Sequence, residues 1–205
     1  MSGILRLSCV LLALLGTGAC TTSPPRDVNN ICAIFQEKDD WYDYAEEAQD
    51  EWGSPIPVMM AIMYQESRFK ADARPPRGTL LGFIPWVRPS SAYGYSQAKT
   101  TTWDEYEDDA GRFGADRDDF GDAIDFIGWY NAQSRRRSGL SLHNTYGLYL
   151  AYHEGHGGYN RATYLQKPWL MSVARKVEAQ SNSYQAQLAG CEEKLKSGSG
   201  FFDWF

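Results

Sequence analysis

The chain has little positive charge and no long apolar run. One apolar run extends from Leu7 to Leu15, and nothing later in the chain reaches the roughly 20 apolar residues that a transmembrane helix needs. We therefore expect no transmembrane helix in the mature protein. Lys and Arg number 20 against 26 Asp and Glu, and the formal net charge of -6 argues against nucleic acid as a partner.

The alternating pattern of β-strands is almost absent, and no internal repeat or low-complexity run is visible. Helical spacing dominates, which predicts an all-α globule with irregular loops around a groove. Ser54 is expected to cap one helix, and Thr102 with Glu105 forms a possible capping box in another. The segment 74–91 is rich in Pro and Gly yet apolar, which suggests a lid or a small hairpin over a cleft. Helices are predicted at about 39–52, 55–69, 102–110, 118–135, 144–154 and 168–188.

Cysteine is scarce, with four residues, and the first two lie at the N-terminus. Arg6, the apolar run and the small residues before Cys20 form an export signal. Gly18-Ala19-Cys20 resembles the lipobox of bacterial lipoproteins, which implies removal of residues 1–19, lipidation of Cys20 and a membrane anchor through that lipid. The expected location is the outer membrane, facing the periplasm.

The other two cysteines, Cys32 and Cys191, lie near the ends of the predicted folded region. In an oxidising periplasm they are expected to form a disulfide, and the alternative is two separate buried thiols. Residues 20–31 are predicted to be a tether and residues 32–192 a single domain. Residues 193–205 form a flexible tail with four aromatic residues, which either folds back or inserts into an envelope protein or a membrane surface.

Glu66 interrupts an otherwise apolar helical stripe. At about 100° per residue it falls on the same face as Met59 and Ile62, which should be buried or line a cleft. Burial disfavours the charged carboxylate and raises its pKa, so the group would hold a proton near neutral pH and could donate it to a leaving oxygen. The alternative is an ordinary helical Glu that reaches solvent or pairs with Arg68.

Two further segments combine glycine with polar and aromatic side chains: residues 92–98 read AYGYSQA and residues 151–159 read AYHEGHGGY. Glycine allows a ligand to approach the backbone closely, and Gln offers both a donor and an acceptor. In order, Glu-Ser on a helix, a Gly-x-x-Gln turn and Ala-Tyr-x-x-Gly resemble the three motifs of the soluble lytic transglycosylase family, relatives of goose-type lysozyme. The resemblance covers roughly residues 40 to 180 and implies a lysozyme-like helical fold with a substrate groove.

The resemblance also implies the roles of individual residues. Glu66 looks like the catalytic acid, and Gln97 and Tyr152 would orient the substrate and the acid. Peptidoglycan glycan strands are the implied partner, with no cofactor. The implied substrate contacts are Ser67, Tyr93, Gly94, Ser96, Gln97, Tyr152, His153 and Glu154.

The family's mechanism needs one carboxyl group. The N-acetyl oxygen of MurNAc attacks its own anomeric carbon while Glu66 protonates the departing oxygen. The ionised Glu then takes a proton from the C6 hydroxyl, and a 1,6-anhydro ring closes. Glu154 leaves an alternative open, because a second carboxylate that activates water would make the enzyme a hydrolytic muramidase. Otherwise Glu154 is a structural acid or a partner of His153.

Other classes of function remain as alternatives. His153, Glu154 and His156 do not have the i, i+4 spacing of a helical zinc site, so we predict no metal. Tyr95-Ser96 and His153-Glu154 stand where the family has Leu-Met and Asn-Ala. These changes and the aromatic tail leave a peptidoglycan-binding scaffold lipoprotein without activity as one alternative. Cleavage of chitin-like GlcNAc polymers is a third possibility.

Overall fold

The computed structural model describes residues 23–77, 79–80, 84–85 and 90–199. The regular elements of the described part are α-helices, one short 3-10 helix and one small hairpin, which confirms the all-α prediction. The signal segment, Cys20 with its predicted lipid, and the aromatic end of the tail lie outside the described residues. The helices are α1 (Ile31–Glu37), α2 (Trp41–Trp52), α3 (Ile56–Ser67), α4 (Thr100–Ala110), α5 (Phe120–Ser138), α6 (Thr145–Asn160), the 3-10 helix η1 (Thr163–Gln166), α7 (Pro168–Leu188) and α8 (Glu192–Ser199).

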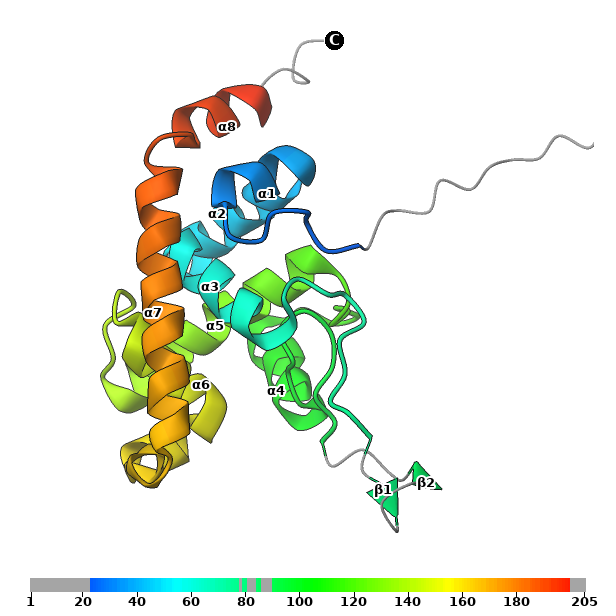
Figure 1. Cartoon of the computed structure of the whole chain (residues 1–205), viewed down its shortest axis with the longest axis vertical. Coiled ribbons are helices and arrows are strands. Elements are labelled where there is room, and N and C mark those ends of the chain that lie inside the picture. Colours follow the sequence, from blue (N-terminus) through cyan, green and yellow to red (C-terminus); the bar gives the residue numbers. More distant parts are fainter. Residues whose placement is uncertain (1–22, 78, 81–83, 86–89, 200–205) are drawn as a thin grey trace, which may run out of the picture.

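The longest helix, α7, runs along most of the length of the molecule and packs against α3 and α6 (Figure 1). Helices α2 and α5 pack against each other, and both also contact α3. The apolar residues of these helices form one continuous core. The core therefore surrounds α3, the helix that carries the predicted acid.

α3 is a central helix because its sequence is apolar on every side. All residues from Ile56 to Met63 are buried, which is the burial expected of a helix without a polar face. The predicted cap at Ser54 is wrong: Pro55 occupies the N-cap position and no side chain caps the helix. Ser54 is fully buried, and its hydroxyl instead accepts a hydrogen bond of 2.9 Å from the Asn131 side chain.

Two other helix ends differ from the prediction. α4 begins at Thr100, so Thr102 lies within the first turn and does not act as a cap. α6 does not end at Glu154 but continues to Asn160 across a kink at Gly155. Gly155 has φ 71° and ψ 156°, which only glycine adopts readily, and the next residues then resume the helix.

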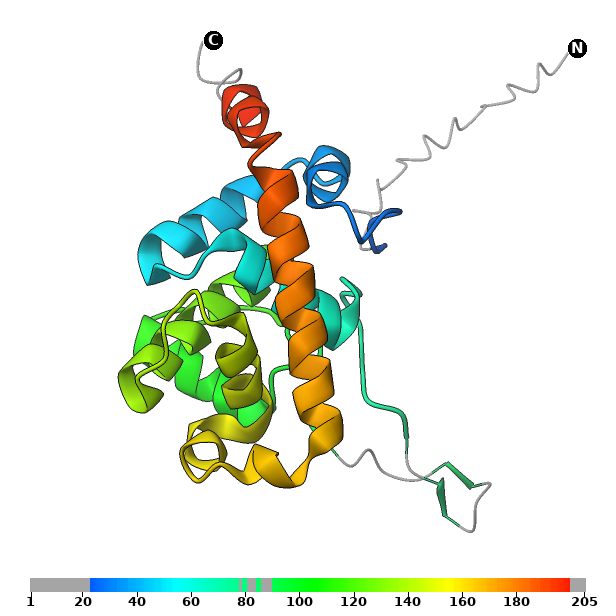
Figure 2. The same ribbon diagram turned by 60° about the vertical axis from the view of Figure 1, so that its left-hand side comes forward.

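The apolar segment 74–91 contains a small hairpin, as predicted, but the predicted position over a cleft is not seen for its two strands. Strands β1 (Thr79–Leu80) and β2 (Ile84–Pro85) pair antiparallel, with Leu80 opposite Ile84. Both strands project away from the helical body in the two views (Figures 1 and 2).

Residues 23–30, the end of the predicted tether, contact the helical domain. Pro25 is buried, and the Lys38 ammonium donates a hydrogen bond of 2.8 Å to the carbonyl of Ser23. The Tyr184 hydroxyl on α7 donates to the carbonyl of Val28. Residues 23–30 therefore lie against the domain, because side chains of the helices satisfy their backbone carbonyls.

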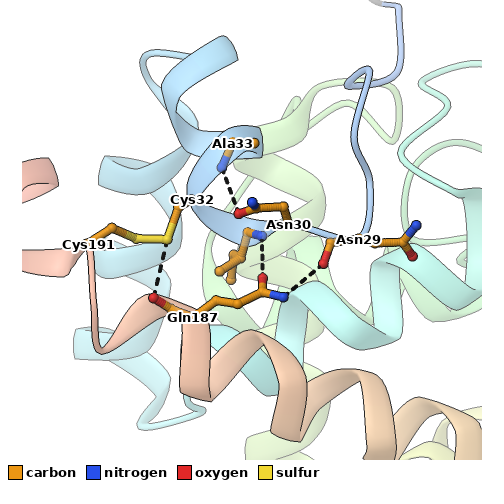
Figure 3. Close-up of a disulfide and its surroundings, with 7 residues drawn as sticks. Asn29, Asn30, Cys32, Ala33, Gln187 and Cys191 are labelled. Atoms are coloured by element: carbon orange, nitrogen blue, oxygen red, sulfur yellow. Dashed lines mark hydrogen bonds between the residues drawn. A yellow bond between two sulfur atoms is a disulfide. The ribbon is translucent and has the colours of Figure 1, made fainter.

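A disulfide joins Cys32 to Cys191, with their Cα atoms 6.1 Å apart (Figure 3). Beside it, the Gln187 side chain accepts a hydrogen bond of 2.9 Å from the backbone N–H of Ile31 and donates one to Asn29. The start of α1 is thus fixed to the end of α7. Residues 193–199 belong to α8, so this part of the predicted flexible tail is helical.

Candidate active site

Glu66 lies in the last turn of α3, at a cavity of about 360 Å³ between α3, the 92–99 loop, α4, α5 and α6. Its side chain is half-buried by surface area, and it lines this cavity. The three predicted motifs therefore meet at one cavity. The lining residues are Glu66, Ala92, Gln97, Ala98, Lys99, Thr102, Phe126, Tyr130, Tyr152, His153, Glu154 and Gly155.

The environment of Glu66 favours the protonated acid. Burial raises the pKa of the Glu66 carboxyl to about 7, and hydrogen bonding from the Tyr149 hydroxyl partly opposes this rise. Desolvation is the larger of these two effects, so the net shift is upward. Near neutral pH the carboxyl can therefore both give up and accept a proton.

Two tyrosines of α6 face Glu66, but in different ways. The predicted Tyr152 donates its hydroxyl hydrogen to the backbone carbonyl of Ser96 at 2.7 Å, which ties α6 to the 92–98 loop. Burial, and then the charge of Glu66, raises the pKa of Tyr152 well above its usual value, so the phenol stays protonated. Tyr149, which the sequence did not single out, is the tyrosine that bonds to the carboxyl. Its signal is a spacing of i, i−3 from Tyr152, which places both side chains on one face of α6.

Gln97 lines the cavity in a constrained conformation. Its φ is +52°, in the left-handed region that residues other than glycine rarely occupy. Its amide nitrogen donates hydrogen bonds of 2.8 Å to the carbonyls of Ala73 and Gly94. These bonds fix the side chain and leave its amide oxygen as the acceptor that it can offer to a ligand.

Four predicted substrate contacts do not line the cavity in the part of the chain that the structure describes. Ser67 is buried and donates to the carbonyl of Met63, and Ser96 is fully buried. The Tyr93 hydroxyl donates to Asp118 at 2.6 Å. Gly94 is needed for backbone packing rather than for a ligand, because a Cβ atom there would lie 1.8 Å from the carbonyl oxygen of Arg117.

Glu154 lines the cavity, but its carboxylate is engaged by protein. The side chain is 4% exposed and accepts hydrogen bonds from Lys167 at 2.7 Å, from Thr163, and from His153 at 3.1 Å. Burial alone would raise its pKa, but these three donors outweigh burial and lower the pKa to about 2. Glu154 is therefore ionised at neutral pH and is a weak base.

The two histidines near the cavity have separate partners. His153 interacts with Glu154, while His156 stacks on Tyr130 and shares a hydrogen bond of 3.0 Å with Ser134. Within the described residues, no three His, Cys, Asp or Glu side chains lie close enough together to hold a metal ion.

A family profile described as "Transglycosylase SLT domain" matches residues 8–191. The chain belongs to this family. The lysozyme-like helical fold of the SLT family is thereby confirmed, and the chain carries the domain of a peptidoglycan-degrading enzyme family. No curated protein and no solved structure gives a significant match. No helix in the described part of this SLT domain is long and apolar enough to span a membrane.

Proposed function

We propose that this SLT domain is a lytic transglycosylase that cleaves the MurNAc–GlcNAc bond of peptidoglycan and forms 1,6-anhydroMurNAc, with Glu66 as its only general acid and base. The observation that carries the proposal is the Glu66 carboxyl, enclosed at the cavity with a pKa raised by burial to about 7. This pKa suits a group that must donate a proton and then take one back.

In the first step, the N-acetyl oxygen of MurNAc attacks the anomeric carbon and the Glu66 proton moves to the departing GlcNAc O4. The ionised Glu66 then removes the proton from the C6 hydroxyl of MurNAc. O6 attacks the anomeric carbon and displaces the acetamido oxygen, so that Glu66 is protonated again and no water is consumed. Gln97 offers its amide oxygen to the sugar. Tyr152 holds the 92–98 loop in place beside the acid.

The state of Glu154 supports this route over hydrolysis. The hydrolytic alternative needs Glu154 as a second carboxylate that takes a proton from water, as in inverting glycosidases. Glu154 already accepts hydrogen bonds from three side chains and has a pKa of about 2, which makes it a poor base. Its geometry suits a structural role.

We further propose that Cys20 is lipidated and anchors the domain in the cell envelope, facing the peptidoglycan. Replacing Cys20 by Ser is expected to release the protein from the membrane fraction and to abolish incorporation of labelled fatty acid. A variant that stays in the membrane fraction and still incorporates labelled fatty acid would contradict the anchor, but not the proposed activity.

The activity is tested by digesting purified sacculi and analysing the released muropeptides by mass spectrometry. The wild type is expected to release anhydromuropeptides, one water lighter than hydrolysed ends. Glu66→Gln should lower the rate by at least about a thousandfold, because it removes the only proton donor. Undiminished release by Glu66→Gln, or hydrolysed ends from the wild type, would contradict the mechanism. Binding to sacculi without turnover by the wild type would favour the scaffold alternative.

A further inference from the structure

An exposed tryptophan lies beside the cavity. Trp169, in the first turn of α7, is 56% exposed. Its ring meets the ring of His153 edge to face, with centroids 5.2 Å apart, and His153 lines the cavity that contains Glu66. Trp169 therefore lies next to a residue of the cavity wall. The exposed large apolar side chains among the described residues are Tyr44, Phe113, Leu165 and Trp169.

The position of this tryptophan is fixed by the contacts of Glu154. The Glu154 carboxylate on α6 binds Thr163 at the start of η1 and Lys167 directly before α7. Pro168 follows at the first helical position, where its fixed φ favours the turn that presents Trp169. The same carboxylate holds Nδ1 of His153 at 3.1 Å. One buried acid thus holds His153 and the residue directly before Pro168 and Trp169, so the two rings are placed side by side at the edge of the cavity.

We propose that Trp169 and His153 form an additional saccharide subsite, in which a glycan residue beyond the cleaved bond packs its C–H face on the indole ring. The proposal rests on the proposed function, since it extends that cavity. Glu154 is a positioning residue for this subsite, because it acts through His153 and Lys167. Rigid aromatic side chains suit this role, since they offer a large apolar face at a low entropic cost and tolerate the polar rim of a sugar ring.

Binding is measured apart from catalysis by placing each change in the Glu66→Gln background. Fluorescence titration with purified, peptide-free glycan strands is the assay. Trp169→Ala is expected to weaken binding about tenfold, and Trp169→Phe, which keeps an aromatic face, about threefold or less. Phe113→Ala is the matched control, because Phe113 is 78% exposed and does not line the cavity. Equal affinities of Trp169→Ala and Phe113→Ala would overturn the subsite.

Kinetics with an active Glu66 distinguish the subsite from a structural role. Trp169→Ala should raise KM on long strands and leave kcat within about twofold, and the defect should vanish on a fragment too short to reach the ring. Glu154→Gln keeps an acceptor but loses the charge. It should also raise KM on long strands with little change in kcat, but by a smaller factor. A uniform fall of kcat on all lengths, or no length dependence, would overturn the proposal. If Glu66→Gln remained active, the proposed function would fail instead, while the dependence of KM on strand length would still report on the subsite.

Discussion

At the scale of single residues, Glu66 combines a functional advantage with a cost in stability. Its carboxyl has an ordinary pKa of 4.5 and a pKa of about 7 in the folded protein, because the charged form is desolvated. Between these values the folded state binds more protons than the unfolded state, so stability falls as pH rises through this window.

Glu66→Gln is therefore expected to stabilise the protein at pH 8 by roughly 2 kcal/mol, less than the full linkage value because the carboxyl borders an open cavity. At pH 4 both proteins carry a neutral group at this position, and their stabilities should be similar. Denaturant unfolding at the two pH values measures this difference. An equal gain in unfolding free energy at pH 4 and pH 8 would show that the charge of Glu66 is not the cause.

Tyr149→Phe tests the second influence on the acid. Its hydroxyl lowers the pKa of Glu66, so its loss should raise that pKa further. The rate of sacculus digestion depends on protonated Glu66, and its alkaline limb should therefore move to higher pH in the variant. Tyr184→Phe is the control, because this buried hydroxyl bonds to Val28. The same pH profile in Tyr149→Phe and the wild type would remove Tyr149 from the site.

The acid could be predicted from the sequence, whereas its partner could not. Glu66 stands out because a carboxyl group is costly among apolar neighbours, and this cost depends on local sequence alone. Tyr149 shares a face of its helix with Tyr152, but several tyrosines lie on this helix and the spacing does not tell which of them bonds to the acid. Four predicted contacts proved to support the loop and α3 rather than line the cavity, because a motif specifies an order of residues but not the direction of their side chains.

At the scale of elements, the 92–98 loop depends on one glycine. Gly94 has φ +77°, and the backbone of Arg117 occupies the space that a Cβ atom would need. The loop in turn supplies the Ser96 carbonyl that holds Tyr152. The position of the cavity wall thus follows from a backbone contact between two loops.

Gly94→Ala is expected to destabilise the protein by more than about 3 kcal/mol, since it combines the cost of a positive φ with a clash against backbone. Gly111→Ala is the matched control: its φ of +68° is similar, but nothing lies within 4 Å of the added methyl group. Gly111→Ala should lower the unfolding free energy by only about 1 kcal/mol. Thermal unfolding compares them, and equal losses would show that the clash with Arg117 is relieved without cost.

At the scale of the whole molecule, the Cys32–Cys191 disulfide closes a loop with a sequence separation of 159 residues. Chain entropy gives such a cross-link about 5 kcal/mol of stabilisation. Reduction should therefore lower Tm by on the order of 10 °C. The double variant Cys32→Ala, Cys191→Ala should show the lower Tm with and without reductant. An unchanged Tm of the reduced wild type would mean that the packing of α1 on α7 suffices.

The sequence by itself determined the helical class, the order of the three motifs and the acid within an apolar helix. Each of these is a property of neighbouring residues, read from spacing and polarity along the chain. Only the tertiary structure decided that Tyr149 bonds to the acid, that Glu154 is bound by Lys167, and that Trp169 lies beside the cavity. These relations join residues on separate turns and helices, and their strength depends on distance and burial, which a linear pattern does not contain.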